Sequence, residues 1–76
     1  MVQRQNELTL YEYIQYQSAM QGLSLNQLAA QLKGKLTAPT LYNLKHNKPR
    51  PKTYAILAQE LNLSITELID LPIHRS

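Results

Sequence analysis

Apolar residues recur along this chain with the three- and four-residue spacing of amphipathic helices, and this pattern predicts an all-α fold. A first helix is predicted for residues 8–21, and Gly22 follows as the left-handed residue that ends it. A fourth helix is predicted to open at Pro51 and to run to Asn62. The buried faces predicted for these two helices consist of Leu10, Tyr11, Tyr13, Ile14 and Met20 in the first, and of Tyr54, Leu57, Ala58 and Leu61 in the fourth.

Two further helices are indicated by capping sequences. Each follows a serine cap that has Gln or Glu three residues later, together with two leucines spaced to pack as a hydrophobic staple. These motifs predict a second helix over 25–33 and a fifth over 65–70, before Pro72. The motif residues are Ser24, Gln27, Leu23 and Leu28 for the second helix, whose inward side adds Leu25, Ala29 and Leu32, and Ser64, Glu67, Leu63 and Leu68 for the fifth.

A short third helix is predicted over residues 38–46. Thr37 is its expected cap, and Pro39 is tolerated because the first turn needs no N–H there. Asn47 is expected to adopt the left-handed conformation that ends the helix. The inward residues are Leu41 and Leu44, and the outward ones are Pro39, Tyr42, Asn43 and His46. An outward face of this kind is free to touch a ligand.

Positive charge is concentrated around this third helix. Six of the eight Lys and Arg residues fall within residues 33–52, which contain no Asp or Glu. This segment has a formal charge of +6, whereas the rest of the chain, with two cations and five carboxylates, has −3. The six cations are Lys33, Lys35, Lys45, Lys48, Arg50 and Lys52. A compact cationic face indicates a polyanionic partner, because neutralised phosphates release their counterions.

The composition argues against several other classes of function. A chain of 76 residues forms one domain with a small core, so a deep catalytic cleft is not expected, and the scattered carboxylates offer no acid–base pair. The chain has no cysteine, and His46 and His74 lack partners at ligand spacing, so neither a metal nor another cofactor is expected. No apolar run approaches the roughly 20 residues of a membrane span, and no signal peptide is recognised. We therefore expect a cytoplasmic protein that is not an enzyme.

Four blocks of sequence, taken in order, resemble the Cro/repressor-type helix-turn-helix domain of the XRE family of phage and bacterial regulators. The blocks cover residues 22–29, 40–44, 47–51 and 57–64. The resemblance implies a compact five-helix lambda-repressor-like domain over residues 8–71, with the helix-turn-helix at the second and third helices. It also implies a flexible N-terminal arm at 1–7, a C-terminal tail at 72–76, and a prokaryotic or phage-encoded, nucleoid-associated protein.

In proteins of this family the third helix enters the major groove of double-stranded DNA, and the second braces against the backbone. The resemblance implies base contacts by Ala38, Pro39, Thr40 and Asn43. Asn43 suits adenine, whereas Ala38 and Pro39 lack hydrogen-bonding side chains, so reading is expected to rely on van der Waals contact and DNA shape. Phosphate contacts are expected from Asn26, Gln27, Lys33, Lys35, Tyr42, Lys45, His46, Lys48, Arg50 and Lys52. For Tyr42 the alternative is a role in covering the core, and for His46 it is an ordinary surface position.

Two departures from the family pattern bear on this interface. The interval from Leu28 to Leu44 is longer than usual by two residues, which enlarges the turn before the third helix. Relatives often pair an Arg and a Glu at the positions held here by Ser18 and Lys45, so we expect Lys45 to be free to face DNA.

The resemblance implies a transcriptional regulator, a repressor that acts by occlusion as a homodimer on a palindromic site, with no small-molecule effector. Ile69, Leu71 and Ile73 are the expected dimer contacts, because they remain apolar after the core is filled. The alternative is an antitoxin or adaptor that binds a toxin or RNA polymerase, which the apolar tail and an exposed Tyr16 favour. RNA is a third option, but the A-form major groove is too narrow for a helix.

Overall fold

The computed structural model describes residues 8–74, and all regular secondary structure in this range is helical. The prediction of an all-α fold is therefore confirmed. The helices are α1 (Leu10–Met20), α2 (Leu25–Gln31), α3 (Ala38–Asn43), α4 (Pro51–Leu61) and α5 (Ile65–Asp70). The predicted arm at 1–7 and the last two residues of the predicted tail, 75–76, lie outside the described residues.

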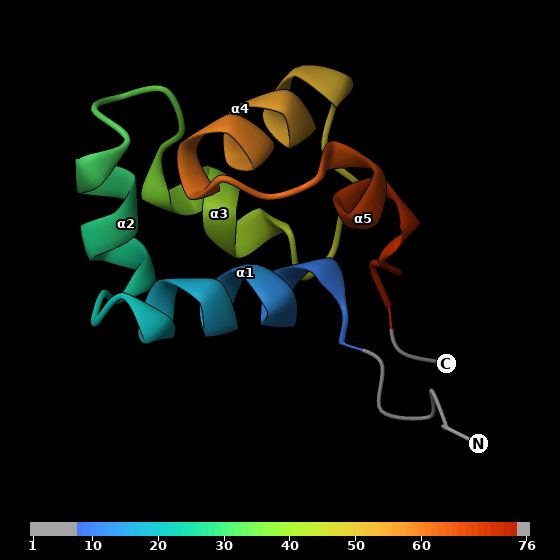
Figure 1. The fold of residues 1–76 in the computed structure, drawn as a ribbon, viewed down its shortest axis with the longest axis horizontal. Helices are drawn as coiled ribbons and strands as arrows, with labels where there is room; N and C mark the ends of the chain where they lie inside the picture. The colour runs from blue at the N-terminus through green and yellow to red at the C-terminus, as the bar shows by residue number, and fades with distance from the viewer. Residues whose placement is uncertain (1–7, 75–76) are drawn as a thin grey trace.

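The helices surround one core that consists mostly of leucine. In the view of Figure 1, α3 occupies the centre, with α1 below it, α2 to the left, α4 above and α5 to the right. Leu36, in the turn between α2 and α3, also belongs to this core, although the sequence pattern did not indicate it. The buried apolar residues are Leu10, Ile14, Leu25, Leu28, Leu32, Leu36, Leu41, Leu44, Tyr54, Leu57, Leu61 and Leu68.

The segment after α5 folds back onto the start of α1. The N–H of Leu10 donates to the carbonyl oxygen of Pro72 at 2.8 Å. Leu71 and Ile73 are half-buried and pack against the core. Each of these two expected dimer contacts is therefore covered in part by the core and exposed in part. Ile69, in contrast, is 48% exposed.

Capping boxes begin both α1 and α2. The Ser24 hydroxyl accepts from the Gln27 N–H at 3.1 Å, and the Gln27 side-chain oxygen accepts from the Ser24 N–H at 2.8 Å. This confirms the predicted start of α2. Thr9 and Glu12 form the same reciprocal pair at the start of α1, at 3.2 and 3.1 Å. The Thr-x-x-Glu spacing was visible in the sequence, but we had started the first helix at Leu8, before the cap.

The capping box predicted for α5 is not present. Ser64 precedes α5, but its side chain makes no capping hydrogen bond. The reason lies in the backbone, because Ser64 has ψ 126°, whereas the caps of α1 and α2 have ψ 167° and 170°. The predicted role of Glu67 in returning the bond is therefore also wrong.

Left-handed residues end three of the helices, though not all at the predicted positions, and one of them is Lys33 after α2, with φ +55°. Gly22, with φ +77°, ends α1 as predicted. Asn47 was wrongly predicted to be left-handed, since hydrogen-bonded turns continue through it and its N–H donates to the Asn43 carbonyl oxygen at 3.0 Å. The residue that ends α4, Asn62, has φ +58° instead. Because the last turns at 44–46 are not α-helical, α3 is shorter than predicted.

The far end of α1 also differs from the prediction. Met20 was placed on the buried face, but it is 66% exposed. Ser18 faces the core instead, where its hydroxyl donates to the Leu23 carbonyl oxygen at 2.9 Å. Met20 follows Ser18 by two residues, which is about 200° around a helix, so it must point away from the core. α2 ends at Gln31 rather than near Lys33, because Leu32 is its C-cap and Lys33 is left-handed.

Tyr54 places a hydroxyl inside the apolar core. The residue is 3% exposed, and its hydroxyl is buried without a hydrogen-bond partner among the described residues. Burial raises the pKa of the Tyr54 hydroxyl above its ordinary value, because the phenolate would be poorly solvated there.

None of the described helices meets the length and hydropathy of a membrane span; the longest, α1 and α4, have 11 residues each.

The different caps of α2 and α5 lead to a stability prediction. Ser24→Ala is expected to lower the free energy of unfolding by about 1 kcal/mol, because it removes the side-chain acceptor of a helix N-terminus. Ser64→Ala is the matched control at the same position of α5, and it is expected to change stability by only about 0.3 kcal/mol, since no capping bond is lost. Urea unfolding of both variants measures the difference, and equal losses would show that Ser64 caps α5 in solution.

The buried Tyr54 hydroxyl leads to a prediction about pH. Tyr54→Phe should leave the stability at pH 7 unchanged or raise it by about 1 kcal/mol, because an unpaired buried hydroxyl is removed. Above about pH 10 the unfolded chain loses the Tyr54 proton before the folded protein does, so stability falls with rising pH. Phenylalanine abolishes this contribution, and the stability difference between variant and wild type should therefore widen between pH 7 and pH 10.5 in urea unfolding. A clear loss of stability at pH 7 would instead mean that the hydroxyl has a partner.

Candidate nucleic-acid interface

The outward face of α3 is built by the burial of its opposite side. Leu41 and Leu44 are 0% and 2% exposed, so the helix can be turned in only one way. Its solvent-facing residues are Pro39, Tyr42, Asn43 and His46, all of them exposed. The predicted division of α3 into an inward and an outward face is therefore confirmed.

The first turn of α3 is less open than its middle. Ala38 and Thr40 are only half-exposed. The Thr37 hydroxyl accepts from the Thr40 N–H at 3.4 Å, and the two threonine hydroxyl oxygens lie 3.0 Å apart. The predicted cap at Thr37 is thus confirmed. The separate contact between the two hydroxyl groups engages the Thr40 hydroxyl that was expected to reach a base. Asn43 is left as the exposed amide among the four expected base contacts.

A groove beside α3 brings several of the expected contacts together. It is formed by α3, the 44–50 segment and the first turn of α4, and has a volume of about 500 Å³. Its lining includes Asn43 next to Lys48 and Arg50, so a candidate for base contact lies beside two candidates for phosphate contact. The remaining lining residues are Thr40, Leu44, Asn47, Pro49 and Thr53.

The N-terminus of α4 opens onto this groove without the groups that usually stabilise a helix start. Its cap residue is Arg50, which makes no side-chain capping bond, and the first turn contains no acidic residue. Arg50 and Lys52 instead place two cations at the positive end of the helix dipole, an unfavourable arrangement. Pro51 lowers the number of unpaired N–H groups by one. This end of α4 would be stabilised by an anion.

The six cations of residues 33–52 differ in their surroundings. Lys35 forms an ion pair with Glu60, 2.5 Å from nitrogen to oxygen, with the two side chains 54% and 26% exposed. Glu60 lies near the end of α4, 25 residues away, so sequence spacing could not reveal the pair. Within residues 8–74, the other cations form no ion pair with a carboxylate. Lys33, Lys48, Arg50 and Lys52 are exposed.

Lys45 lies over α1 and is less free than expected. Its ammonium nitrogen is 5.3 Å from the centre of the Tyr11 ring, a cation–π distance. The rings of Tyr11 and Tyr42 are 6.5 Å apart at their centroids and are tilted by 41°. Tyr42 is still 41% exposed, so it both contacts α1 and offers its hydroxyl to solvent.

The start of α2 offers fewer free donors than expected. Asn26 and Gln27 are exposed. However, the Gln27 N–H donates to the Ser24 hydroxyl, and its side-chain oxygen accepts from the Ser24 N–H. The capping box thus occupies the Gln27 backbone donor that was expected to hold a phosphate oxygen. The Asn26 backbone N–H is not part of the box, and it stays a candidate for such a contact together with the side-chain amide groups of both residues.

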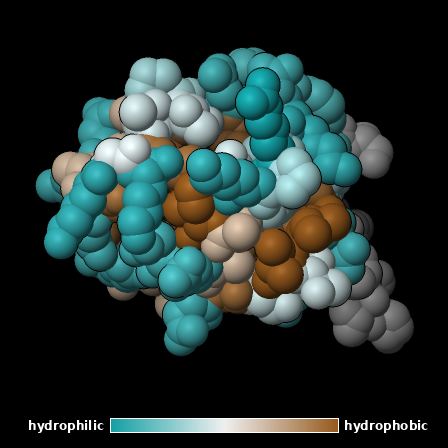
Figure 2. Space-filling model, turned by 90° about the horizontal axis from the view of Figure 1, so that it is seen from above, coloured by the Kyte–Doolittle hydropathy of each residue, from teal (hydrophilic) through white to brown (hydrophobic). Residues whose placement is uncertain are grey.

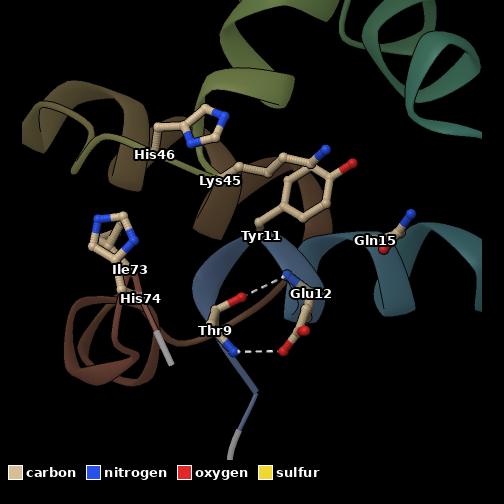
Figure 3. Close-up of a pocket in the computed structure, with 8 residues that line it drawn as sticks. All are labelled: Thr9, Tyr11, Glu12, Gln15, Lys45, His46, Ile73 and His74. Carbon is tan, nitrogen blue, oxygen red and sulfur yellow. Dashed lines mark hydrogen bonds between the residues drawn. The ribbon is translucent and has the colours of Figure 1, made fainter. Parts of the chain in front are cut away.

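A second hollow lies between α1 and the turns that follow α3, and it shares no lining residue with the groove. Figure 3 shows its residues, with the Thr9–Glu12 capping box at the base and Lys45 beside the ring of Tyr11. The lining consists of Thr9, Tyr11, Glu12, Gln15, Lys45, His46, Ile73 and His74. Sequence reasoning missed Gln15 and His74. Helical spacing does place Tyr11 and Gln15 on one face, but only the packing of α1 against α3 shows what that face meets.

The expected dimer surface is reduced to the outer side of α5. Ile65 and Ile69 are 39% and 48% exposed, and they line an apolar hollow with Tyr54 and the prolines at 49 and 51. Lys48 lies at the same hollow. Figure 2 shows hydrophobic side chains gathered on this face, among hydrophilic ones, toward the end of the molecule where α5 lies. No group of side chains suited to a metal ion occurs among residues 8–74.

Comparison of the chain with protein-family models, with curated proteins and with solved structures gave no match.

Proposed function

We propose that this protein is a sequence-specific regulator of transcription that binds double-stranded DNA, with α3 and its following turns, residues 38–46, inserted into the major groove. The sequence resembles Cro/repressor-type helix-turn-helix domains, and we propose that the chain has their lambda-repressor-like architecture. In that arrangement α2 and α3 form the helix-turn-helix, and the protein acts as a repressor by occluding its site.

The observation that carries the proposal is the start of α4. Arg50 and Lys52 stand at the positive end of the helix dipole, without a carboxylate or a capping side chain to offset them. This arrangement disfavours the free protein and favours a complex with an anion. Because the same helix end lines a groove with the exposed Asn43, the anion and the group that Asn43 reads would be parts of one ligand. A DNA duplex provides phosphates beside base edges in this way.

The outward face of α3 fits the dimensions of a major groove, which is about 12 Å wide and admits one helix. Asn43 can donate to N7 and accept from N6 of adenine. Ala38 and Pro39 offer only van der Waals surface, so much of the selectivity would come from DNA shape. Lys33, Lys48, Arg50 and Lys52 supply the phosphate contacts, while Lys35 is partly neutralised by Glu60.

A second copy of the chain would bind through α5. Ile65 and Ile69 are the exposed apolar residues there, and pairing would shield them from water. A two-fold dimer then presents two α3 helices about 34 Å apart on a palindromic site.

A second candidate function is the binding of a protein partner, as an antitoxin or as an adaptor to RNA polymerase. The exposure of Tyr16 and Met20, 55% and 66%, favours it, because these side chains are four residues apart on one face of α1. DNA binding would then be secondary.

Selection from a random duplex library tests the proposal. The purified protein is expected to enrich a palindrome and to bind it at least about a thousandfold more tightly than a scrambled duplex. Affinities are measured across a salt series, since non-specific binding is lost as salt rises. Uniform, salt-sensitive binding without an enriched motif would overturn sequence specificity and favour the protein-partner function.

Asn43→Ala tests the proposed base contact. The change should weaken binding to the selected duplex by about 1 to 3 kcal/mol and leave binding to a scrambled duplex nearly unchanged, because a base-edge contact is lost. Fluorescence anisotropy on both duplexes measures the two effects.

Arg50→Gln is the contrasting control for this test. This change should weaken binding to the selected and the scrambled duplex equally. It should also reduce the slope of log affinity against log salt by about one, because one phosphate contact is removed. Equal losses on both duplexes for Asn43→Ala would remove Asn43 from the set of base contacts.

A further inference from the structure

The hollow between α1 and the end of α3 gathers hydrogen-bond donors from three parts of the chain. Gln15 comes from α1, Lys45 and His46 from the turns after α3, and His74 from the segment after α5. Figure 3 shows the two imidazole rings toward one end of the hollow and the Lys45 ammonium beside the Tyr11 hydroxyl further along. A hollow lined by donors of these kinds suits an anion with several oxygens.

The charges that face this hollow are mostly positive or able to become so. Lys45 provides one fixed cation, which the Tyr11 ring holds at 5.3 Å from its centre. The one carboxylate in the lining, Glu12, accepts the Thr9 N–H at 3.1 Å as part of the α1 cap. His46 and His74 are both exposed, and an imidazole becomes a cation when it takes up a proton. Protonation of both histidines would place three cations, Lys45, His46 and His74, around the hollow.

The position of the hollow relates it to the proposed DNA interface. His46 belongs to the same outward side as Asn43 and lies about one helical turn further along, roughly 5 Å. The major groove is about 12 Å wide. A helix that contacts base edges in the groove therefore has a sugar-phosphate backbone close to the end of the helix. The groove that contains Arg50 shares no lining residue with this hollow. The two hollows are therefore placed to contact different parts of the backbone.

We infer that this hollow holds a phosphate of the DNA backbone, and that His46 and His74 make the grip stronger as pH falls. The inference rests on the proposed DNA-binding function and adds Gln15 and His74 to the interface. It assigns the phosphodiester to a site distinct from the start of α4. Since a phosphate contact carries no sequence information, its pH dependence should appear on any duplex.

The test compares duplex affinity at pH 7.5, 6.5 and 5.5 at constant ionic strength. Wild type should gain about tenfold over this range, the amount expected of one added charge-assisted contact, on selected and arbitrary duplexes alike. The double variant His46→Gln and His74→Gln should lose most of this gain. Lys33→Gln, a change outside the hollow, should weaken binding equally at each pH and keep the gain. Circular dichroism and thermal unfolding establish that each variant is folded.

A fixed charge provides the reverse test. His46→Arg together with His74→Arg should bind at pH 7.5 about as tightly as wild type does at pH 5.5, and show little change with pH. If wild type binds duplexes with the same affinity at all three pH values, or if the glutamine variant keeps the full gain, the inference is wrong while the proposed function stands. If wild type binds no duplex at any pH, the proposed function fails and the inference fails with it.

Inorganic phosphate distinguishes a free anion from the DNA backbone. Titration of the protein without DNA, followed through the histidine ring resonances by NMR, reports direct phosphate binding. Shifts of the His46 and His74 resonances at low phosphate concentration, combined with pH-independent duplex affinity, would assign the hollow to a free phosphate and overturn the inference. Duplex affinity that rises with falling pH, and that is reduced when phosphate replaces chloride at equal ionic strength, supports it.

Discussion

The burial of Leu41 and Leu44 is the interaction on which the rest of the molecule depends. α3 has six residues, far fewer than the roughly 12 to 15 that an isolated helix needs in water. It exists because these two leucines are packed among the other helices, and their spacing fixes which side of α3 meets solvent. The core and the candidate interface are therefore one structure, and a change that loosens the core also disorganises the surface that would read DNA.

Departures from locally favourable structure gather around this surface. The cations at the start of α4 oppose its dipole, and Lys33 adopts a left-handed conformation, φ +55°, that a side chain makes costly. α1 and α2, in contrast, begin with complete capping boxes. Local rules are most often broken where a protein contacts its partner, because selection there acts on the complex rather than on the free chain.

The sequence was a good guide to features that are set by nearby residues. The Ser24–Gln27 box, the turn at Gly22 and the two faces of α3 each depend on residues a few positions apart, and these predictions were confirmed. The same capping motif gave a wrong prediction at Ser64. The backbone there has a ψ angle that the motif does not determine.

Features that depend on packing could not be obtained from spacing. The ion pair of Lys35 with Glu60 and the position of Lys45 over Tyr11 join segments that are distant along the chain. The presence of His74 beside the end of α3 has the same origin. For this reason the exposed face of α3 was predictable from its sequence, whereas the state of each cation and the hollow at α1 required the fold.

The hydrogen bond from the Leu10 N–H to the Pro72 carbonyl oxygen joins the start of α1 to the segment after α5. The start of α1 and the segment after α5 lie at the same corner of the molecule (Figure 1). These two parts of the chain are thus neighbours in space although they are far apart in the sequence. A permuted chain, joined across this corner and opened in the exposed turn at Lys33 and Gly34, would retain every helix and every buried leucine of the original order.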